Sequence, residues 1–257
     1  MKYLLIFIIN LLNVLPVFAI RPEKQYLNTP EKLGVDFEEI RVKTKDDIAL
    51  NVWHLPAEAG GLPIVISQSD AGNMGYWLYL GMYLQAYGFD VWLYDYRGFG
   101  ESGDFVMDTD QLFYSEFVED LSTVVDYVYR RMSVAPVLMG ISMGTIIVNE
   151  YMKNATIPIT FLIYDGYVAS PYKWVKKLAA NGKSVRLPDG YKPAKYVNRH
   201  QDKLYIVGTA DKYSVVEDIP NRRSRKTTVK MFDSDHISSF SQYPHEYVIE
   251  IIKFVMS

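Results

Sequence analysis

The segment Gly140-Ile141-Ser142-Met143-Gly144 places a serine between two glycines, directly after one apolar run and directly before another. If a parallel strand turns sharply into a helix here, Ser142 stands at the carboxyl edge of the sheet, where open α/β folds bind ligands. The two glycines allow backbone to pack where a Cβ would collide, and the helix N-terminus can stabilise an oxyanion. The pattern predicts a nucleophile; the alternative is a tight connection without chemistry.

A nucleophilic serine needs a general base, and the chain offers four histidines. His236 lies in the loop between the last predicted strand and the last predicted helix, which emerges at the same edge as Ser142. His54 ends a strand far from that edge. His200 and His245 occupy positions typical of solvated side chains. We therefore assign His236 as the candidate base.

The base in turn needs an acid to orient it. Asp211 follows the next-to-last predicted strand in "YIVGTADKYSV", so the chain order is serine, aspartate, histidine, as expected for this architecture. Asp165, in "LIYDG", reaches the same edge and is the rival. Asp233 and Asp235 adjoin the histidine in sequence, but we interpret them as loop carboxylates that face water. Asp211 is the preferred acid.

The elements that would position these residues follow from hydrophobic spacing. A polar leader (20–34) precedes an antiparallel hairpin (37–44 and 48–55), and apolar runs then alternate with helical periodicity. Further strands are predicted at 62–67, 89–95, 135–141, 157–165, 203–208 and 226–232, and helices at 74–87, 111–132, 142–153, 171–180 and 244–255. The predicted fold class is α/β, a mostly parallel eight-stranded sheet with the second strand antiparallel and helices on both faces.

Composition narrows the class of protein. The 257 residues suffice for one α/β domain or two small ones, and 22% charged residues is ordinary for a globular chain. The net charge of −3 without a basic block gives no reason to expect a nucleic-acid partner. The absence of cysteine excludes disulfides, thiolate zinc sites and a cysteine nucleophile.

The first 19 residues differ from the rest. One lysine, an apolar stretch and a small-residue ending at Ala19 form the layout of a secretory signal peptide cleaved after that alanine. The alternative is an uncleaved anchor or a buried helix. The signal peptide predicts a secreted or periplasmic protein in which residues 20–257 form the mature domain.

With these residues placed, the sequence resembles the α/β-hydrolase superfamily, specifically serine hydrolases with a small cap. "DYRGFGESG" (95–103) is similar to the D-x-R-G-x-G-x-S turn of that family, "GISMG" to its nucleophile elbow and "GTADKYSV" to its acid loop. We expect the turn to be structural, with Asp95 and Arg97 paired locally.

The resemblance also implies that the backbone N–H groups of Asp70 and Met143 form the oxyanion hole. One departure stands here, because family members commonly carry His-Gly-Asn-Ala-Gly-Asn where this chain has "QSDAGN" (68–73). An ionised Asp70 pointing inward would oppose oxyanion formation. We expect its side chain instead to turn away and cap the following helix.

The cap segment is predicted at about 166–202, which leaves room for one helix and a loop. Its aromatic residues are suited to holding an acyl chain, and its lysines to an anionic substrate or weak contact with a membrane surface. The alternative is a solvated basic face with a few packing aromatics.

Together these features predict an exported serine hydrolase that cleaves a carboxylic ester or related acyl bond of a small-molecule or lipid-like substrate through an acyl-enzyme. Such a mechanism requires neither metal nor organic cofactor. Peptidases, thioesterases and acyltransferases use the same machinery. The departure at 68–70 motivates a different alternative, a non-catalytic binding protein on a hydrolase scaffold.

Overall fold

The computed structural model describes residues 19–257 except 59, 183 and 195–199. The predicted signal peptide therefore lies outside the described residues apart from Ala19. Ten strands are described: β1 (Arg21–Pro22), β2 (Glu38–Lys43), β3 (Ala49–Leu55), β4 (Leu62–Ser67), β5 (Ala71–Gly72), β6 (Phe89–Tyr94), β7 (Val137–Ile141), β8 (Phe161–Asp165), β9 (Asp202–Gly208) and β10 (Thr227–Phe232). The α-helices are α1 (Pro30–Leu33), α2 (Leu78–Ala86), α3 (Ser115–Met132), α4 (Met143–Tyr151), α5 (Pro171–Ala180), α6 (Ser239–Gln242) and α7 (Pro244–Val255), with 3₁₀ turns η1 (Met74–Trp77) and η2 (Val216–Asp218).

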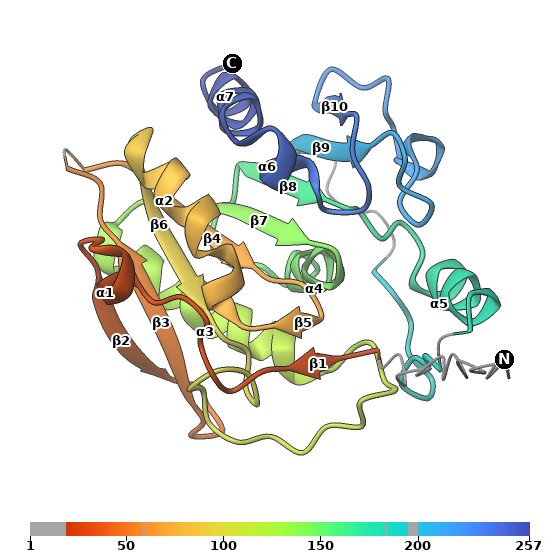
Figure 1. The fold of residues 1–257 in the computed structure, drawn as a ribbon, viewed down its shortest axis with the longest axis horizontal. Helices are drawn as coiled ribbons and strands as arrows, with labels where there is room; N and C mark the ends of the chain where they lie inside the picture. Colours follow the sequence, from red (N-terminus) through yellow and green to blue (C-terminus); the bar gives the residue numbers. More distant parts are fainter. Residues whose placement is uncertain (1–18, 59, 183, 195–199) are drawn as a thin grey trace, which may run out of the picture.

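Eight of these strands form one sheet in the order β10-β9-β8-β7-β4-β6-β3-β2 (Figure 1). Strand β3 is antiparallel to both of its neighbours, and the pairs from β6 to β10 are parallel. The predicted α/β fold class, with eight strands and the second antiparallel, is confirmed. The carboxyl ends of β4, β7, β9 and β10 consequently meet at one edge.

Helices cover both faces of this sheet: α2 and α7 lie against one face, α3 and α4 against the other (Figure 1). Strand β6 is apolar except for Asp90 because both of its faces are buried. Val91 and Leu93 belong to the core cluster beneath α2 and α7, whereas Trp92 and Tyr94 belong to the cluster beneath α3 and α4. A strand buried on both faces carries no polar alternation.

Two predicted helices have different starts. The helix predicted from residue 74 begins as the 3₁₀ turn η1 and becomes α-helical only in α2. The helix predicted from Gln111 begins at Ser115. The residues before it pair with the cap segment instead, because Leu112 N–H donates to Arg186 O (3.0 Å) and Arg186 N–H to Asp110 O (2.8 Å). Tertiary pairing here overrides the helical spacing.

The predicted cap segment contains one helix, α5, at the predicted position. Sequence spacing did not reveal a second, two-stranded sheet, in which β1 pairs in parallel with β5. That pairing lays the leader along the loop after β4 (Figure 1). Within the part of the chain that the structure describes, no helix is both long and apolar enough to cross a bilayer.

Candidate active site

Ser142 stands at the turn from β7 into α4 in a strained conformation, with φ 51° and ψ −113°. Such a φ is rare for a residue with a Cβ and is characteristic of a nucleophile elbow. The flanking glycines make the turn possible. A Cβ at Gly144 would lie 1.9 Å from Ser67 O, and one at Gly140 would lie 2.7 Å from Gly144 O. The serine is therefore held where the sequence pattern predicted it.

Hydrogen bonds to its backbone stabilise this elbow from two sides. Ser142 N–H donates to Asp165 O at the end of β8 (2.8 Å). On the other side, Thr145 Oγ1 donates to Ser142 O (2.7 Å) and accepts from Val168 N–H at the base of the cap (3.0 Å). These bonds stabilise a backbone conformation that would otherwise relax.

The side chains of Ser142, His236 and Asp211 come together from three strand ends. Ser142 Oγ lies 2.9 Å from His236 Nε2, and His236 Nδ1 lies 2.7 Å from Asp211 Oδ2. Both distances are within hydrogen-bond reach, which a nucleophile, a base and an orienting acid require. Ser142 itself is only 1% exposed. The arrangement is therefore chemically capable of activating a serine.

The Asp211 carboxylate is held in its ionised form. Burial alone would raise the pKa of this carboxyl, but the hydrogen bond and charge of His236 and the N–H groups of Ser214 (3.0 Å) and Tyr213 (2.7 Å) outweigh burial and lower the pKa. An ionised acid fixes the imidazole tautomer with Nδ1 protonated and leaves Nε2 free to accept a proton.

The His236 ring lies against a glycine, which leaves room for it, and packs near two aromatic rings. Gly166 has φ 62°, and a Cβ there would lie 2.6 Å from His236 Cε1. On the cap side, the rings of Trp174 and Tyr213 have centroids 6.1 and 5.8 Å from that of His236. The imidazole is thus positioned by packing as well as by its hydrogen bonds.

The rival acid, Asp165, reaches the same region but binds a different partner. It is 2% exposed, and its Oδ2 accepts a hydrogen bond from Tyr247 Oη of α7 (2.8 Å). Burial raises its pKa to about 6, against the smaller lowering effects of Tyr247 and of the His236 charge. Asp165 is therefore a buried neighbour of the site and Asp211 the hydrogen-bonded one.

We predict that Asp165→Asn changes how stability depends on pH. Because the folded pKa of about 6 exceeds the ordinary aspartate pKa of 3.8, the native state binds this proton more tightly, so the contribution of Asp165 to stability is lost as pH rises from about 4 to 6. The asparagine variant lacks that loss. Relative to wild type, its free energy of unfolding should rise by about 2 kcal/mol between pH 4.5 and 7, measured by urea unfolding. An identical pH dependence in the two proteins would contradict the prediction.

The other histidines lie elsewhere. His54 of β3 is buried, stacked on Trp92 and 2.6 Å from Asp90 Oδ1. His200 and His245 are exposed, as are the loop carboxylates of Asp233 and Asp235. Among the described residues, no group of three or more His, Asp or Glu side chains could hold a metal ion.

Met143 directly follows Ser142, and Asp70 lies in the loop after β4, whose first residue Gln68 packs its carbonyl against Gly144 of the elbow. Met143 is the first residue of α4, so its N–H has no partner within the helix. The carbonyl of Asp70 accepts a hydrogen bond from Arg21 N–H (2.8 Å), one of the bonds that join the leader to this loop. The expected helix cap by Asp70 is wrong. Asn73 caps η1 instead, accepting from Gly75 N–H (3.1 Å), because β5 intervenes between Asp70 and the helical turn.

Asp95 braces the loop after β4, a role that the sequence analysis missed. Its carboxylate accepts from Met74 N–H (2.7 Å), from Gln68 Nε2 (3.4 Å) and from the phenol of Tyr26 in the leader. Burial raises the Asp95 pKa to about 6, although these donors act to lower it. A Cβ at Gly100 would lie 1.9 Å from Asp95 Oδ2, which explains a glycine of the "DYRGFGESG" turn.

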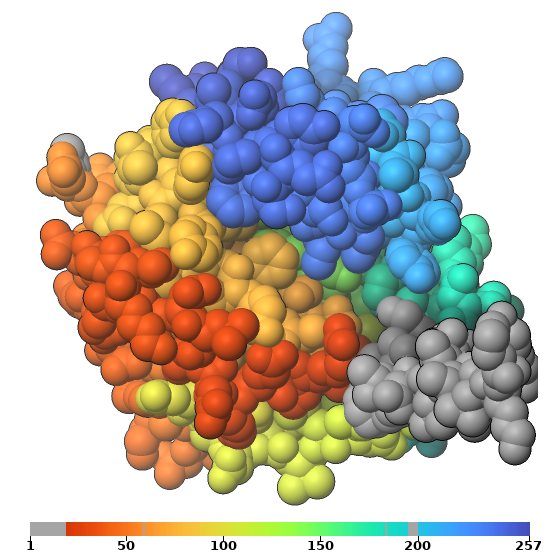
Figure 2. Space-filling view, viewed as in Figure 1, coloured from red at the N-terminus to blue at the C-terminus, as the bar shows by residue number. Residues whose placement is uncertain are grey.

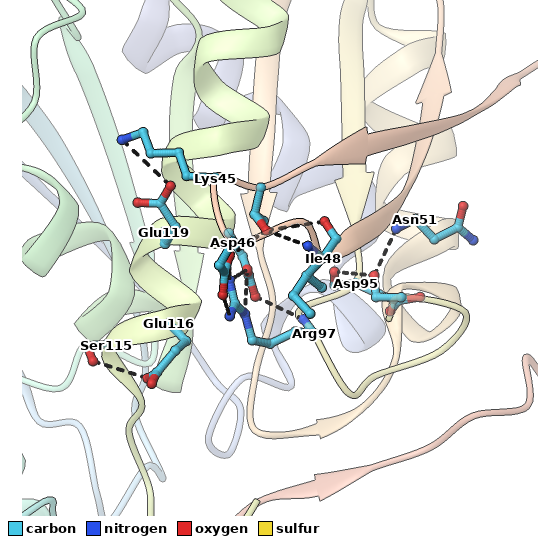
Figure 3. A network of polar contacts seen from close by, with 12 residues as sticks. Lys45, Asp46, Ile48, Asn51, Asp95, Arg97, Ser115, Glu116 and Glu119 are labelled. Carbon is cyan, nitrogen blue, oxygen red and sulfur yellow. Dashed lines mark hydrogen bonds and ion pairs between the residues drawn. The ribbon is translucent and has the colours of Figure 1, made fainter. Parts of the chain in front are cut away.

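The expected local pair of Asp95 with Arg97 is therefore wrong. Arg97 reaches away from Asp95 and bonds both carboxylate oxygens of Asp46 (2.6 and 3.1 Å; Figure 3). Its Nε donates to Asp120 Oδ1 of α3 (2.8 Å). Arg97 and Asp120 are both buried. The guanidinium has several N–H donors in a fixed plane, so it can bond the carboxylates of Asp46 and Asp120 together.

Comparison with known proteins identifies a family and several relatives. Residues 71–235 match the model of the family Hydrolase_4, described as serine aminopeptidase, S33. The uncharacterized protein YfhR of Salmonella typhimurium is 27% identical over an alignment that covers 99% of this chain and 94% of that protein. An uncharacterized membrane protein of Saccharomyces cerevisiae is 31% identical over 80 residues, which are 31% of this chain and only 28% of the yeast protein.

Solved structures share the fold. The esterase Pf2001 of Pyrococcus furiosus superposes with a TM-score of 0.73 at 17% identity, covering 92% of this chain and 98% of that one. An esterase from Exiguobacterium antarcticum superposes with a TM-score of 0.61 at 17% identity, covering 86% and 100%. Since the family model matches more than half of the chain, this protein is a hydrolase that belongs to the Hydrolase_4 family of the α/β-hydrolase fold.

Proposed function

We propose that this hydrolase is an exported serine esterase, which cleaves a carboxylic ester or related acyl bond through an acyl-enzyme on Ser142. The observation that carries the proposal is the continuous chain of contacts from Ser142 Oγ to His236 (2.9 Å) and from His236 to Asp211 (2.7 Å), behind a strained elbow. Two solved structures with the same fold are esterases, which supports the choice of an ester.

In the proposed acylation, Ser142 Oγ attacks the acyl carbon while its proton passes to His236 Nε2. The carbonyl electrons move onto oxygen, and the N–H groups of Met143 and Asp70 hold the resulting oxyanion. The intermediate collapses, the bond to the leaving oxygen breaks, and that oxygen takes the proton from His236. Water then repeats the sequence on the acyl-enzyme and releases the acid. Asp211 orients His236 and stabilises its cationic form.

A fluorophosphonate probe tests the proposal, because it phosphonylates serines that are activated in this way. The protein should be labelled, Ser142→Ala should not, and the matched Ser115→Ala variant of an exposed serine on α3 should be labelled normally. Protein that has not been treated with the probe is then offered p-nitrophenyl esters and aminoacyl p-nitroanilides, since the family description names an aminopeptidase. Preferential turnover of anilides would favour the peptidase alternative. A folded but unlabelled protein would overturn the serine mechanism and favour a binding role.

Asp70 is expected to restrain this reaction. Asp70 is half-buried in the loop after β4, and its backbone N–H is one of the two proposed oxyanion donors, so its carboxylate belongs to the same residue as a group that would hold the oxyanion. A partly screened charge within several ångströms opposes an oxyanion by about 1–4 kcal/mol. Asp70→Asn should therefore be labelled roughly tenfold faster or more, and Asp189→Asn, an exposed cap carboxylate, at the wild-type rate. Equal rates for all three proteins would show that Asp70 does not act on the oxyanion.

Export rests on the pattern of residues 1–19. Cleavage after Ala19 would make Ile20 the first residue, which is buried and donates its N–H to Thr109 O (2.9 Å). The ammonium group created by cleavage would keep that hydrogen bond. Recovery of mature protein with Ile20 at its N-terminus would support export, whereas an intact N-terminus in a membrane fraction would contradict it.

A further inference from the structure

A pocket of about 680 Å³ is lined in part by residues next to the candidate active site, Ser69 beside Asp70 and Ile237 directly after His236. It lies where the leader, the loop after β4 with α2, and the C-terminal residues meet, and Figure 2 views the molecule from the same side as Figure 1, with these parts in red, gold and blue. Much of its lining is hydrocarbon and aromatic, from Tyr76, Trp77, Tyr79, Tyr83, Ile237 and Phe240. Its volume is within the range of small-molecule sites.

Two walls of this pocket connect it to the reaction. One is formed by Ser69 and Ala71, which flank Asp70 in the loop after β4. The other begins at Ile237, the residue directly after His236. Ile237 has φ 51°, which is strained for a β-branched residue, and a Cβ at Gly166 would lie 2.7 Å from its Cγ2. The structure therefore holds an apolar side chain in an unfavourable backbone conformation between the base and the pocket.

The pocket also presents aromatic surface to solvent. Tyr76 and Tyr79 are 47% and 46% exposed, and Tyr83 meets Phe240 edge to face at 5.5 Å between centroids. Large aromatic side chains exposed around a concavity indicate a site that a ligand covers.

Charge selects the chemistry of that ligand. Among the described residues, the lining contains one cation, Arg21, and one anion, Glu23, whose carboxylate is already bonded to Tyr76 Oη (2.9 Å). The opposite charges balance, so the pocket favours neither a cationic nor an anionic group. A neutral aromatic or branched hydrocarbon group matches both the lining and the charge.

We propose that this pocket binds the leaving-group side of the substrate, which makes the enzyme selective for esters of bulky apolar alcohols; this rests on the proposed esterase function. The assignment follows from the proton transfer. His236 Nε2 must protonate the leaving oxygen, so the alcohol lies beside His236, and the residue that follows His236 forms a wall of the pocket. The acyl part then lies toward Trp174 and Tyr213 on the cap side.

Butyrate esters of ethanol, 2-phenylethanol and 2-(1-naphthyl)ethanol test this assignment, because they share an acyl group and have alcohols of similar acidity. The expected kcat/KM rises with alcohol size, and the ratio of naphthylethyl to ethyl ester falls about fivefold or more in Tyr79→Ala and in Phe240→Ala. Ser241→Trp, which fills the pocket from an exposed position, should lower the same ratio. Tyr129→Ala, a half-exposed tyrosine on α3, is the matched control and should keep it.

An acyl series with a constant ethyl group completes the experiment. Pocket variants that change acyl-length preference but leave alcohol preference intact would overturn the assignment, and so would a wild-type enzyme that is indifferent to alcohol size. Failure of the proposed function is distinguishable, because the wild-type protein would then escape fluorophosphonate labelling and hydrolyse none of the esters.

Discussion

In Ser142→Ala, in His236→Ala and in the double variant, kcat should fall by the same factor, about 10⁶. The reason is that the two side chains act as one unit. Without the oxygen there is no nucleophile, and without the imidazole 2.9 Å away nothing accepts its proton. Steady-state hydrolysis of a p-nitrophenyl ester by the three variants measures this directly.

The controls are Ser115→Ala and His245→Ala, two exposed residues of the same types outside the site, which should keep wild-type rates. Circular dichroism melting of each variant separates loss of chemistry from loss of fold. Losses that multiply in the double variant would mean that Ser142 and His236 act independently, and the proposed mechanism would fail.

Asp211→Asn should lower kcat by about 10⁴-fold while leaving the fold in place. The amide keeps the shape of the carboxylate but carries no negative charge, so it no longer stabilises the cationic imidazole. It can also turn its NH₂ group toward Nδ1, and the tautomer with Nδ1 protonated is then no longer selected. Because the pKa of Asp211 is lowered in the native state, the ionised form acts throughout the neutral range. Kinetics on a p-nitrophenyl ester and probe labelling should fall together.

Two other aspartates, Asp165 and Asp233, serve as comparisons for this test. Asp165→Asn keeps a hydrogen-bond partner for Tyr247 and should lower kcat by less than about tenfold. Asp233→Asn, an exposed carboxylate of the histidine loop, should have no effect. If Asp165→Asn were the more damaging variant, the acid of the site would be at the end of β8 and not of β9.

Much of the fold is predictable because its signals are local. The central strands β4, β7 and β8 are mostly apolar runs buried on both faces, and the Ser142 elbow carries its steric requirement in the two glycines that flank it, Gly140 and Gly144. The positions of Asp211 and His236 follow from topology, since the loops after parallel strands emerge at one edge. Distances between side chains were not predictable, and they decide between Asp211 and Asp165.

The contacts that the sequence concealed span long separations. Tyr26 bonds Asp95 across 69 residues, and no periodicity connects a polar leader with a glycine-rich turn. Arg97 likewise bonds Asp46 across 51 residues, although Asp95 is its near neighbour in sequence. Two-residue strands such as β1 and β5 are too short to produce an alternating pattern, so their pairing exists only in three dimensions.

The β1–β5 pairing has a practical consequence for how this enzyme is produced. Ile20 is fully buried, and Asn73 Nδ2 donates to the carbonyls of Glu23 (3.1 Å) and Gln25 (2.8 Å). The first residues after Ala19 therefore pack against the loop after β4 and support it. An affinity tag or fusion partner joined directly to Ile20 would compete for these contacts with the loop. The opposite terminus is open, with Met256 80% exposed. A purification handle placed after Ser257 leaves the loop undisturbed.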